Sequence, residues 1–82
     1  MTRQEIFTLL CPIVSELLDV APEEIHEDSD FFADLRADSL HMVDLVMKVE
    51  EKLNVEIDDE DVQEMQTVGQ VIDYLEMVLK TR

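Results

Sequence analysis

The chain has 82 residues, which is enough for one domain, residues 1–82, with a single hydrophobic core and too few for a deep catalytic cleft. Hydrophobic residues make up 46% of it and aromatic residues 5%, with one glycine and two prolines, a composition that favours an all-α fold. Its 21 acidic and 6 basic residues give a net charge of −15, which repels nucleic acid and anionic membranes and attracts proteins with lysine and arginine patches.

Cysteine usage, metal motifs and hydropathy exclude several classes of protein. Cys11 is the only cysteine, so an intrachain disulfide is excluded, and two histidines without a second thiol do not make a zinc site. The stretch 28–30 resembles the start of a calcium loop, but Ala33 and Ser39 stand where such a loop has Gly and Glu, so we exclude that site. No apolar run has the length of a membrane span or the plan of a signal peptide. We therefore expect a cytoplasmic protein without stable membrane insertion.

The first predicted helix runs from about Arg3 to Leu18. Its apolar residues at helical spacing are Ile6, Leu9, Leu10, Ile13 and Leu17. Thr2 and Glu5 have the spacing of a capping box, in which each side chain accepts a backbone N–H of the other residue. Pro12 lies inside the pattern and removes one backbone donor, so we expect a kink there.

From Asp19 to about Asp38 the helical periodicity fails, and we expect a long surface connection. Pro22 and the acidic run that follows it are typical of loops. A loop of this length in a small domain needs apolar anchors and indicates a functional segment. The candidate anchors are Val20, Ile25, Phe31, Phe32 and Leu35.

The second predicted helix, about Ser39 to Leu53, has two apolar stripes. The broad stripe is expected to enter the core and contains Met42, Leu45, Val46, Val49 and Leu53. The opposite stripe is Leu40, Val43 and Met47, flanked by Asp44, Glu50 and Glu51. The pattern leaves two interpretations open: ordinary surface hydrophobes, or a docking surface for a partner whose apolar contacts are surrounded by Lys and Arg.

The rest of the chain predicts a short helix and a longer one. Asn54 can adopt the left-handed conformation that ends the second helix. The four acidic residues 58–61 mark the start of a short third helix. Thr67 and Gln70 form a second capping box before a last helix that extends to about Lys80. We therefore predict a small four-helix bundle, with three longer helices, a short third one and a long connector between the first two.

Ser39 stands where the polar connector becomes the second helix. Helix N-termini have unpaired N–H groups and the positive end of the macrodipole, so a serine there can cap the helix, and a phosphate attached to it is stabilised. Position alone favours the capping role, because most serines at helix starts have no other.

The residues around Ser39 closely resemble those of the acyl carrier proteins of fatty-acid and polyketide synthesis. The central match is the segment DLRADSL, from Asp34 to Leu40, and its form before the serine is more similar to acyl than to peptidyl carriers. Further matches lie at 31–32, 43–47, 50–51, 56–60, 67–69 and 72–75. The resemblance therefore extends over nearly the whole chain. It favours a role for Ser39 as an attachment site over a role as a helix cap.

The resemblance implies that Ser39 receives phosphopantetheine from coenzyme A through a phosphodiester, with Asp38 and Leu40 beside it. The protein then supplies no catalytic group and is not an enzyme, because the acyl chain is held as a thioester on the thiol of the arm. We expect a free-standing monomeric carrier for fatty-acid biosynthesis. The implied partners are phosphopantetheinyl transferase, ketoacyl synthases, malonyl transferase, reductases, a dehydratase and acyltransferases, all with basic docking patches.

The resemblance also implies two groups of residues on and around the second helix. The partner-binding surface comprises Asp38, Leu40, Val43, Asp44, Met47, Glu50 and Glu51. The acyl pocket, between the second and third helices, is lined by Phe31, Met42, Val46, Val49, Ile57, Val62 and Met65. Unbranched methionines suit a core that must open.

Three positions depart from the family pattern. Arg36 stands where the family usually has glycine, and His41, taken as a surface residue, stands where an acidic residue often follows. The approach to Ser39 is therefore less negative than usual, which bears on the choice of partner. Asp58 replaces a frequent proline at the entry to the third helix, and we expect a looser loop there.

Two other functions remain as hypotheses. One is a carrier for a polyketide or another specialised acyl pathway, which the acyl chain on the purified protein would reveal. The other, from a different class, is an acidic helical adaptor that recruits basic partners without a prosthetic group. The adaptor predicts binding that survives Ser39→Ala.

Overall fold

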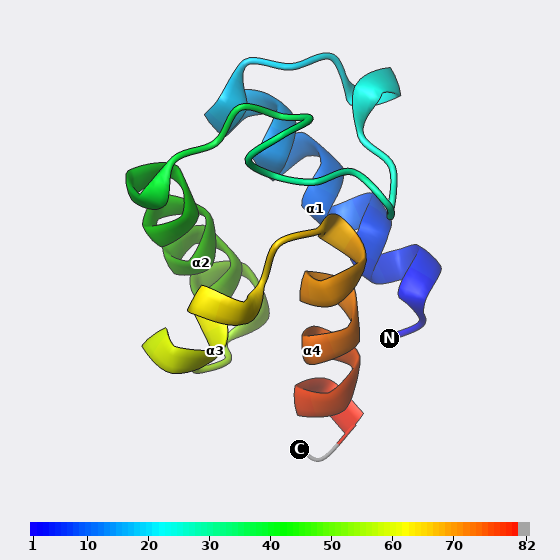
Figure 1. Ribbon diagram of the computed structural model, residues 1–82. Coiled ribbons are helices and arrows are strands. Elements are labelled where there is room, and N and C mark those ends of the chain that lie inside the picture. Colours follow the sequence, from blue (N-terminus) through cyan, green and yellow to red (C-terminus); the bar gives the residue numbers. More distant parts are fainter. Residues whose placement is uncertain (81–82) are drawn as a thin grey trace.

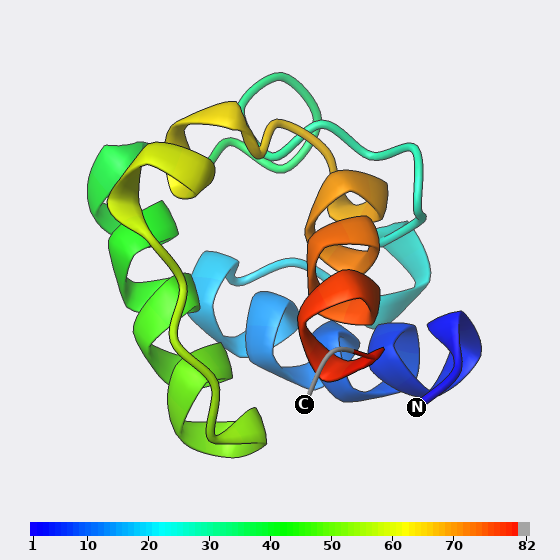
Figure 2. The same ribbon diagram turned by 90° about the horizontal axis from the view of Figure 1, so that it is seen from below.

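The computed structural model describes residues 1–80 and consists of four α-helices with a long connector between the first two (Figure 1). The helices are α1 (Arg3–Leu18), α2 (Ser39–Leu53), α3 (Asp59–Glu64) and α4 (Val68–Lys80), and a 3-10 turn, η1 (Pro22–Glu24), lies in the connector. α1 packs against both α2 and α4, while α3 packs against α2. Seen from below, α2 and α4 lie on opposite sides of the view, α1 runs across from α2 to α4, and α3 lies beside α2 (Figure 2). The predicted all-α four-helix bundle with a short third helix is confirmed.

The two predicted capping boxes are present. Before α1, Thr2 Oγ1 accepts the Glu5 N–H at 3.2 Å, and Glu5 Oε1 accepts the Thr2 N–H at 2.9 Å. Before α4, Thr67 Oγ1 accepts the Gln70 N–H at 3.2 Å, and Gln70 Oε1 accepts the Thr67 N–H at 3.0 Å. Each box satisfies backbone donors that have no partner inside the helix, so these short sequence signals set where the helices begin.

Left-handed residues end α1 and α2. Asp19 follows α1 with φ 55°, and Asn54 follows α2 with φ 53°, as predicted for Asn54.

Two further points concern the helices as a whole. No helix within residues 1–80 is long and apolar enough to cross a membrane. α1 includes Pro12 within its span, and the kink expected there stays a prediction.

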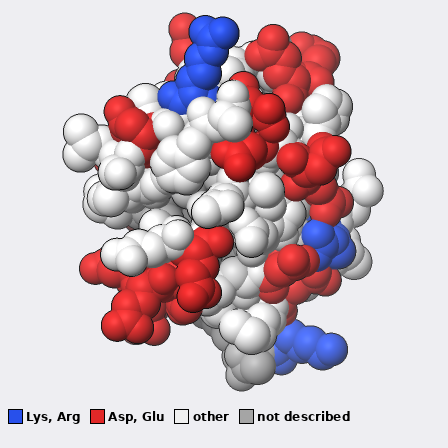
Figure 3. Space-filling model, viewed as in Figure 1, with Lys and Arg blue, Asp and Glu red and all other residues white. Residues whose placement is uncertain are grey.

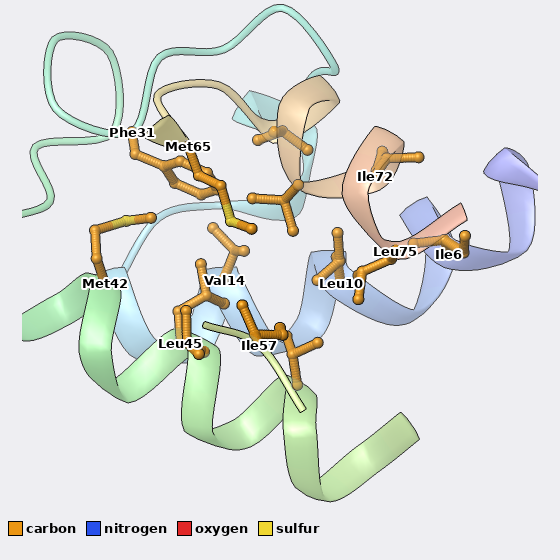
Figure 4. Close-up of a cluster of buried hydrophobic side chains, with 14 of the residues drawn as sticks. Ile6, Leu10, Val14, Phe31, Met42, Leu45, Ile57, Met65, Ile72 and Leu75 are labelled. Atoms are coloured by element: carbon orange, nitrogen blue, oxygen red, sulfur yellow. The ribbon is translucent and has the colours of Figure 1, made fainter. Parts of the chain in front are cut away.

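The apolar faces of the helices meet in one core. Figure 4 shows Phe31, Met42 and Met65 at one end of the buried cluster and Ile6 and Leu75 at the other. Burying a side chain of this size contributes about 1.5–3 kcal/mol to folding. The largest fully buried side chains are Phe31, Ile6, Leu10, Ile72, Leu75, Val14, Val49 and Val68.

The connector is bonded to the first turn of α4. The Val68 N–H donates to the Ser29 carbonyl at 3.1 Å, and the Gly69 N–H donates to the Glu27 carbonyl at 2.7 Å. A Cβ atom at Gly69 would stand 3.0 Å from the Glu27 carbonyl oxygen. The close approach of the two backbones therefore favours a glycine, the only one in the chain, at this position.

The prediction that Phe32 anchors the connector is wrong. Its side chain is 45% exposed. The Asp30 carboxylate accepts the N–H groups of Phe32 and Ala33 at 2.8 and 2.9 Å, which forms a tight turn. Within that turn Phe31 is fully buried in the core (Figure 4), whereas its neighbour Phe32 is exposed. The other predicted anchors, all buried or half-buried, are Val20, Ile25, Phe31 and Leu35.

A single arginine connects three segments of this acidic chain. Arg3 of α1 forms ion pairs with Glu27 of the connector at 2.5 Å, with Glu76 of α4 at 2.6 Å and also with Asp73 of α4. Hydrogen bonds to Glu27, Asp73 and Glu76 raise the pKa of Arg3. On the face in Figure 3, acidic side chains form large clusters, and basic side chains are few and separate.

Candidate functional site

A capping box formed by Asp38 and His41 starts α2. Asp38 Oδ1 accepts the His41 N–H at 2.9 Å, and His41 Nδ1 accepts the Asp38 N–H at 3.2 Å. Asp38 has the extended backbone of a capping residue, with φ −120° and ψ −176°, whereas Ser39 is already inside the helix. The capping role that position alone favours for Ser39 is therefore wrong, because Asp38 performs it.

The capping box formed by Asp38 and His41 was not predicted from the sequence. The three-residue spacing that could have indicated it is present, but the third position of a capping box is usually Glu or Gln. Here an imidazole nitrogen provides the acceptor. His41 is partly exposed, in keeping with the predicted surface position, and its imidazole also takes part in the cap.

Ser39 is the first residue of α2, and its hydroxyl is free. The side chain is exposed and forms no hydrogen bond within residues 1–80. The Met42 N–H donates to the Asp38 carbonyl at 3.1 Å, so the N–H groups of Ser39 and Leu40 lie ahead of the first helical bond. Unpaired N–H groups and the positive end of the helix stabilise an anion at this place. The site therefore fits a phosphodiester on the Ser39 oxygen.

The chain reaches Ser39 through a left-handed residue. Arg36 has φ 61° and is exposed between the buried residues Leu35 and Ala37. The Ala37 N–H donates to the Phe31 carbonyl at 2.7 Å, which holds this bend in place. A left-handed conformation costs a residue with a Cβ atom about 1–2 kcal/mol, a cost that glycine avoids. Arg36 therefore replaces the usual glycine of the family at a position whose backbone conformation favours glycine.

The predicted second apolar stripe of α2 faces solvent. Leu40, Val43 and Met47 are 74%, 51% and 53% exposed. Such neighbouring apolar side chains with carboxylates beside them form a continuous surface along the helix. We call this surface the docking strip, and it consists of Leu40, Val43, Asp44, Met47 and Glu51.

The short helix α3 is held by few contacts. None of its residues is buried, and Asp58, which precedes it, makes no side-chain capping bond. Glu50, one of the predicted partner-binding residues, is half-buried, and its carboxylate accepts the Ile57 N–H at 3.0 Å, so it joins α2 to the segment before α3. Burial and a hydrogen bond to Asp61 raise the pKa of the Tyr74 hydroxyl on α4. Because α3 has no buried residue, we expect it to open more readily than the rest of the fold.

The predicted acyl-pocket residues lie in the core. Phe31, Met42 and Met65 gather at one end of the buried cluster (Figure 4). Protein interiors are closely packed, so a chain inserted here has to displace side chains or move a helix. The buried members are Phe31, Met42, Val46, Val49, Ile57 and Met65, and Val62 is half-buried.

Known proteins are similar to this chain in sequence and in fold. The family model described as a phosphopantetheine attachment site matches residues 8–75. An acyl carrier protein of Wolinella succinogenes is 51% identical over 71 residues, which are 87% of this chain and 93% of that relative. An acyl carrier protein of Thermotoga maritima is 41% identical over 78 residues, 95% of this chain and 96% of that relative. The solved structure of an acyl carrier protein from Enterococcus faecalis has a TM-score of 0.79 and 31% identity, over 95% of this chain and 99% of that one.

Proposed function

This chain belongs to the acyl carrier protein family, and from that premise we propose that it carries growing acyl chains for fatty-acid biosynthesis on a phosphopantetheine arm attached to Ser39. The family consists of carriers rather than catalysts. The arm, when attached, supplies a flexible thiol that holds the acyl group as a thioester. The residues of the chain have the tasks of positioning the attachment oxygen and presenting a surface to partner enzymes.

The free hydroxyl of Ser39 is the observation that supports the attachment most directly. Because Asp38 caps α2, modification of Ser39 removes no hydrogen bond on which the helix depends. The hydroxyl is exposed, as access by a transferase requires. The unpaired N–H groups of the first turn stabilise the phosphate charge that the modification introduces.

We propose that the docking strip, together with Asp38 and Glu50, binds the basic patches of the partner enzymes. Its apolar centre excludes water at the contact, and its carboxylates attract Lys and Arg before contact. A small contact area with charges screened by salt is released quickly. This suits a carrier that must visit a transferase, synthases, reductases and a dehydratase in turn.

We also propose that the acyl chain enters the core between α2 and α3. The predicted pocket residues, including Met42 and Met65, are apolar and lie beside the helix with the fewest buried contacts. Unbranched methionines change shape at low energetic cost. Movement of α3 away from α2 would expose this region to a chain held on the arm.

Loading the protein in vitro tests the attachment. We expect incubation with coenzyme A and a broad-specificity phosphopantetheinyl transferase to add the mass of one phosphopantetheine group. Ser39→Ala should abolish the addition while leaving the helical circular dichroism unchanged. Ser15→Ala on α1 is the control: it removes the hydrogen bond from the Ser15 hydroxyl to the Val20 carbonyl but leaves Ser39 in place, so it should still load. A folded wild-type sample that never gains mass would contradict the proposal.

The acyl chains on protein purified from its native cells test the pathway. Saturated chains of stepwise increasing length would support fatty-acid biosynthesis, whereas chains with several keto groups would indicate a polyketide pathway. The cytoplasmic location and the monomeric state remain predictions from the sequence. Fractionation and sedimentation of the loaded protein would test them.

A further inference from the structure

A groove on the outer side of the bundle lies between α1 and the second half of α2, away from Ser39. Its volume is about 580 Å³, within the range of roughly 300–1,000 Å³ typical of small-molecule sites. α1 supplies three apolar side chains and one glutamate, and α2 supplies only charged side chains. The lining residues are Leu9, Pro12, Ile13, Glu16, Lys48, Glu51 and Lys52.

Lys48 and Lys52 give this groove a local charge unlike that of the rest of the protein. They are one helical turn apart on α2, so their side chains start roughly 5–6 Å from each other. Within residues 1–80 neither lysine forms an ion pair, whereas Arg3 is surrounded by carboxylates. In a chain of net charge −15, two neighbouring lysines that form no ion pair, beside the apolar residues Leu9, Pro12 and Ile13, are an exception.

The acidic residues at the groove limit what the two lysines can bind. Glu16 and Glu51 also line it, so their carboxylates repel a ligand with several negative charges. A single carboxylate can contact both ammonium groups and remain neutralised by them. The stems of the lysines and the side chains of Leu9 and Ile13 can cover an aliphatic chain.

We propose that this groove binds one long-chain aliphatic carboxylate, with its head group between Lys48 and Lys52 and its tail on Leu9, Pro12 and Ile13. An anionic membrane surface is disfavoured as an alternative occupant by the net charge of the chain. The ligand is non-covalent and needs no arm on Ser39. The proposal is therefore independent of the proposed carrier function, and either can fail alone.

Titration of the full-length chain with laurate, below its micelle concentration and followed by NMR of backbone amides and methyl groups, tests the site. We expect saturable shifts at Leu9, Ile13, Lys48 and Lys52. The double variant Lys48→Gln/Lys52→Gln should raise the apparent Kd about tenfold, because two charge-assisted contacts are lost. Lys80→Gln, which removes a lysine on α4 outside the groove, should leave the Kd unchanged.

Two ligands with the same tail separate charge from hydrophobicity. Dodecanol, which lacks the charge, and dodecylammonium, which reverses it, should shift the groove resonances much less than laurate does. An acidic protein by default attracts the ammonium ligand, so a preference for laurate has to come from the lysines. Equal binding of laurate and dodecanol, an unchanged Kd in the double variant, or shifts confined to core residues such as Met42 and Met65 would each overturn the proposal.

Discussion

The carboxylate of Asp38 accepts the backbone N–H of His41 at 2.9 Å, and the imidazole of His41 accepts the backbone N–H of Asp38 at 3.2 Å. This reciprocal pair caps α2 with the residue immediately before Ser39. Ser39, which follows Asp38, forms no side-chain hydrogen bond within residues 1–80 that a modification would break. The separation of the two tasks, capping by one residue and attachment by the next, leads to the first prediction.

Asp38→Ala should destabilise the protein, whereas Ser39→Ala should leave its stability nearly unchanged. Loss of the cap should lower the free energy of unfolding by about 1 kcal/mol, whereas Ser39→Ala should change it by less than about 0.5 kcal/mol. Urea denaturation followed by circular dichroism measures the difference. Ser39→Ala should nevertheless abolish phosphopantetheine addition. Equal destabilisation by the two variants would mean that Ser39 shares the capping role.

Leu40→Ala should slow loading by the transferase without unfolding the protein. Leu40 is 74% exposed in the docking strip and lies beside Ser39, and loss of an apolar contact worth about 1–1.5 kcal/mol lowers kcat/KM about five- to tenfold. Met77 on α4 is 57% exposed and lies outside the docking strip, so Met77→Ala is the matched control. If both variants load at the wild-type rate, the transferase does not use the strip.

Arg36→Gly should stabilise the protein. The left-handed φ of 61° costs arginine about 1–2 kcal/mol, and the greater freedom of glycine in the unfolded chain offsets part of the gain. We expect a net increase of about 0.5–1 kcal/mol in the free energy of unfolding. Arg36→Ala removes the same charge but keeps a Cβ atom, so it should give no such increase. A similar gain in both variants would assign the effect to charge rather than to backbone conformation.

Gly69→Ala should destabilise the protein, against the usual preference of helices for alanine. Helix propensity alone predicts a gain of up to about 1 kcal/mol. The added Cβ would stand 3.0 Å from the Glu27 carbonyl oxygen, and the backbones can separate only by stretching the 2.7 Å bond between them. We expect a net loss of about 1 kcal/mol by urea denaturation. The sign of the change decides between propensity and close approach.

The stability of the protein should depend on Tyr74 at high pH. Burial, and after it the hydrogen bond to Asp61, raise the pKa of the hydroxyl above its ordinary value of about 10. Because the folded pKa is the higher one, this stabilisation is complete below about pH 10 and is lost as the pH rises through the folded pKa. The wild type should therefore lose more stability above about pH 10 than Tyr74→Phe does. Parallel pH profiles of the two proteins would exclude this linkage.

Much of the fold follows from local sequence. The capping boxes at Thr2 and Thr67 and the left-handed Asn54 are properties of a few neighbouring residues, and they mark helix ends in the structure as predicted. The two stripes of α2 follow from helical geometry, so the exposure of Leu40 and the burial of Leu45 could be expected without coordinates.

The tertiary structure decided matters that depend on contacts between distant segments or on backbone angles. The backbone angles and the hydrogen bond from the His41 N–H show that Asp38 rather than Ser39 caps α2, and the turn at Asp30 leaves Phe32 exposed. The reason for Gly69 lies in its contact with Glu27, and the groove beside Lys48 exists only because α1 packs against α2. Periodicity and capping are encoded within one or two helical turns, so the sequence determined the helices and their faces by itself. Contacts between residues far apart in the chain depend on how those helices pack, and they became visible only in the folded structure.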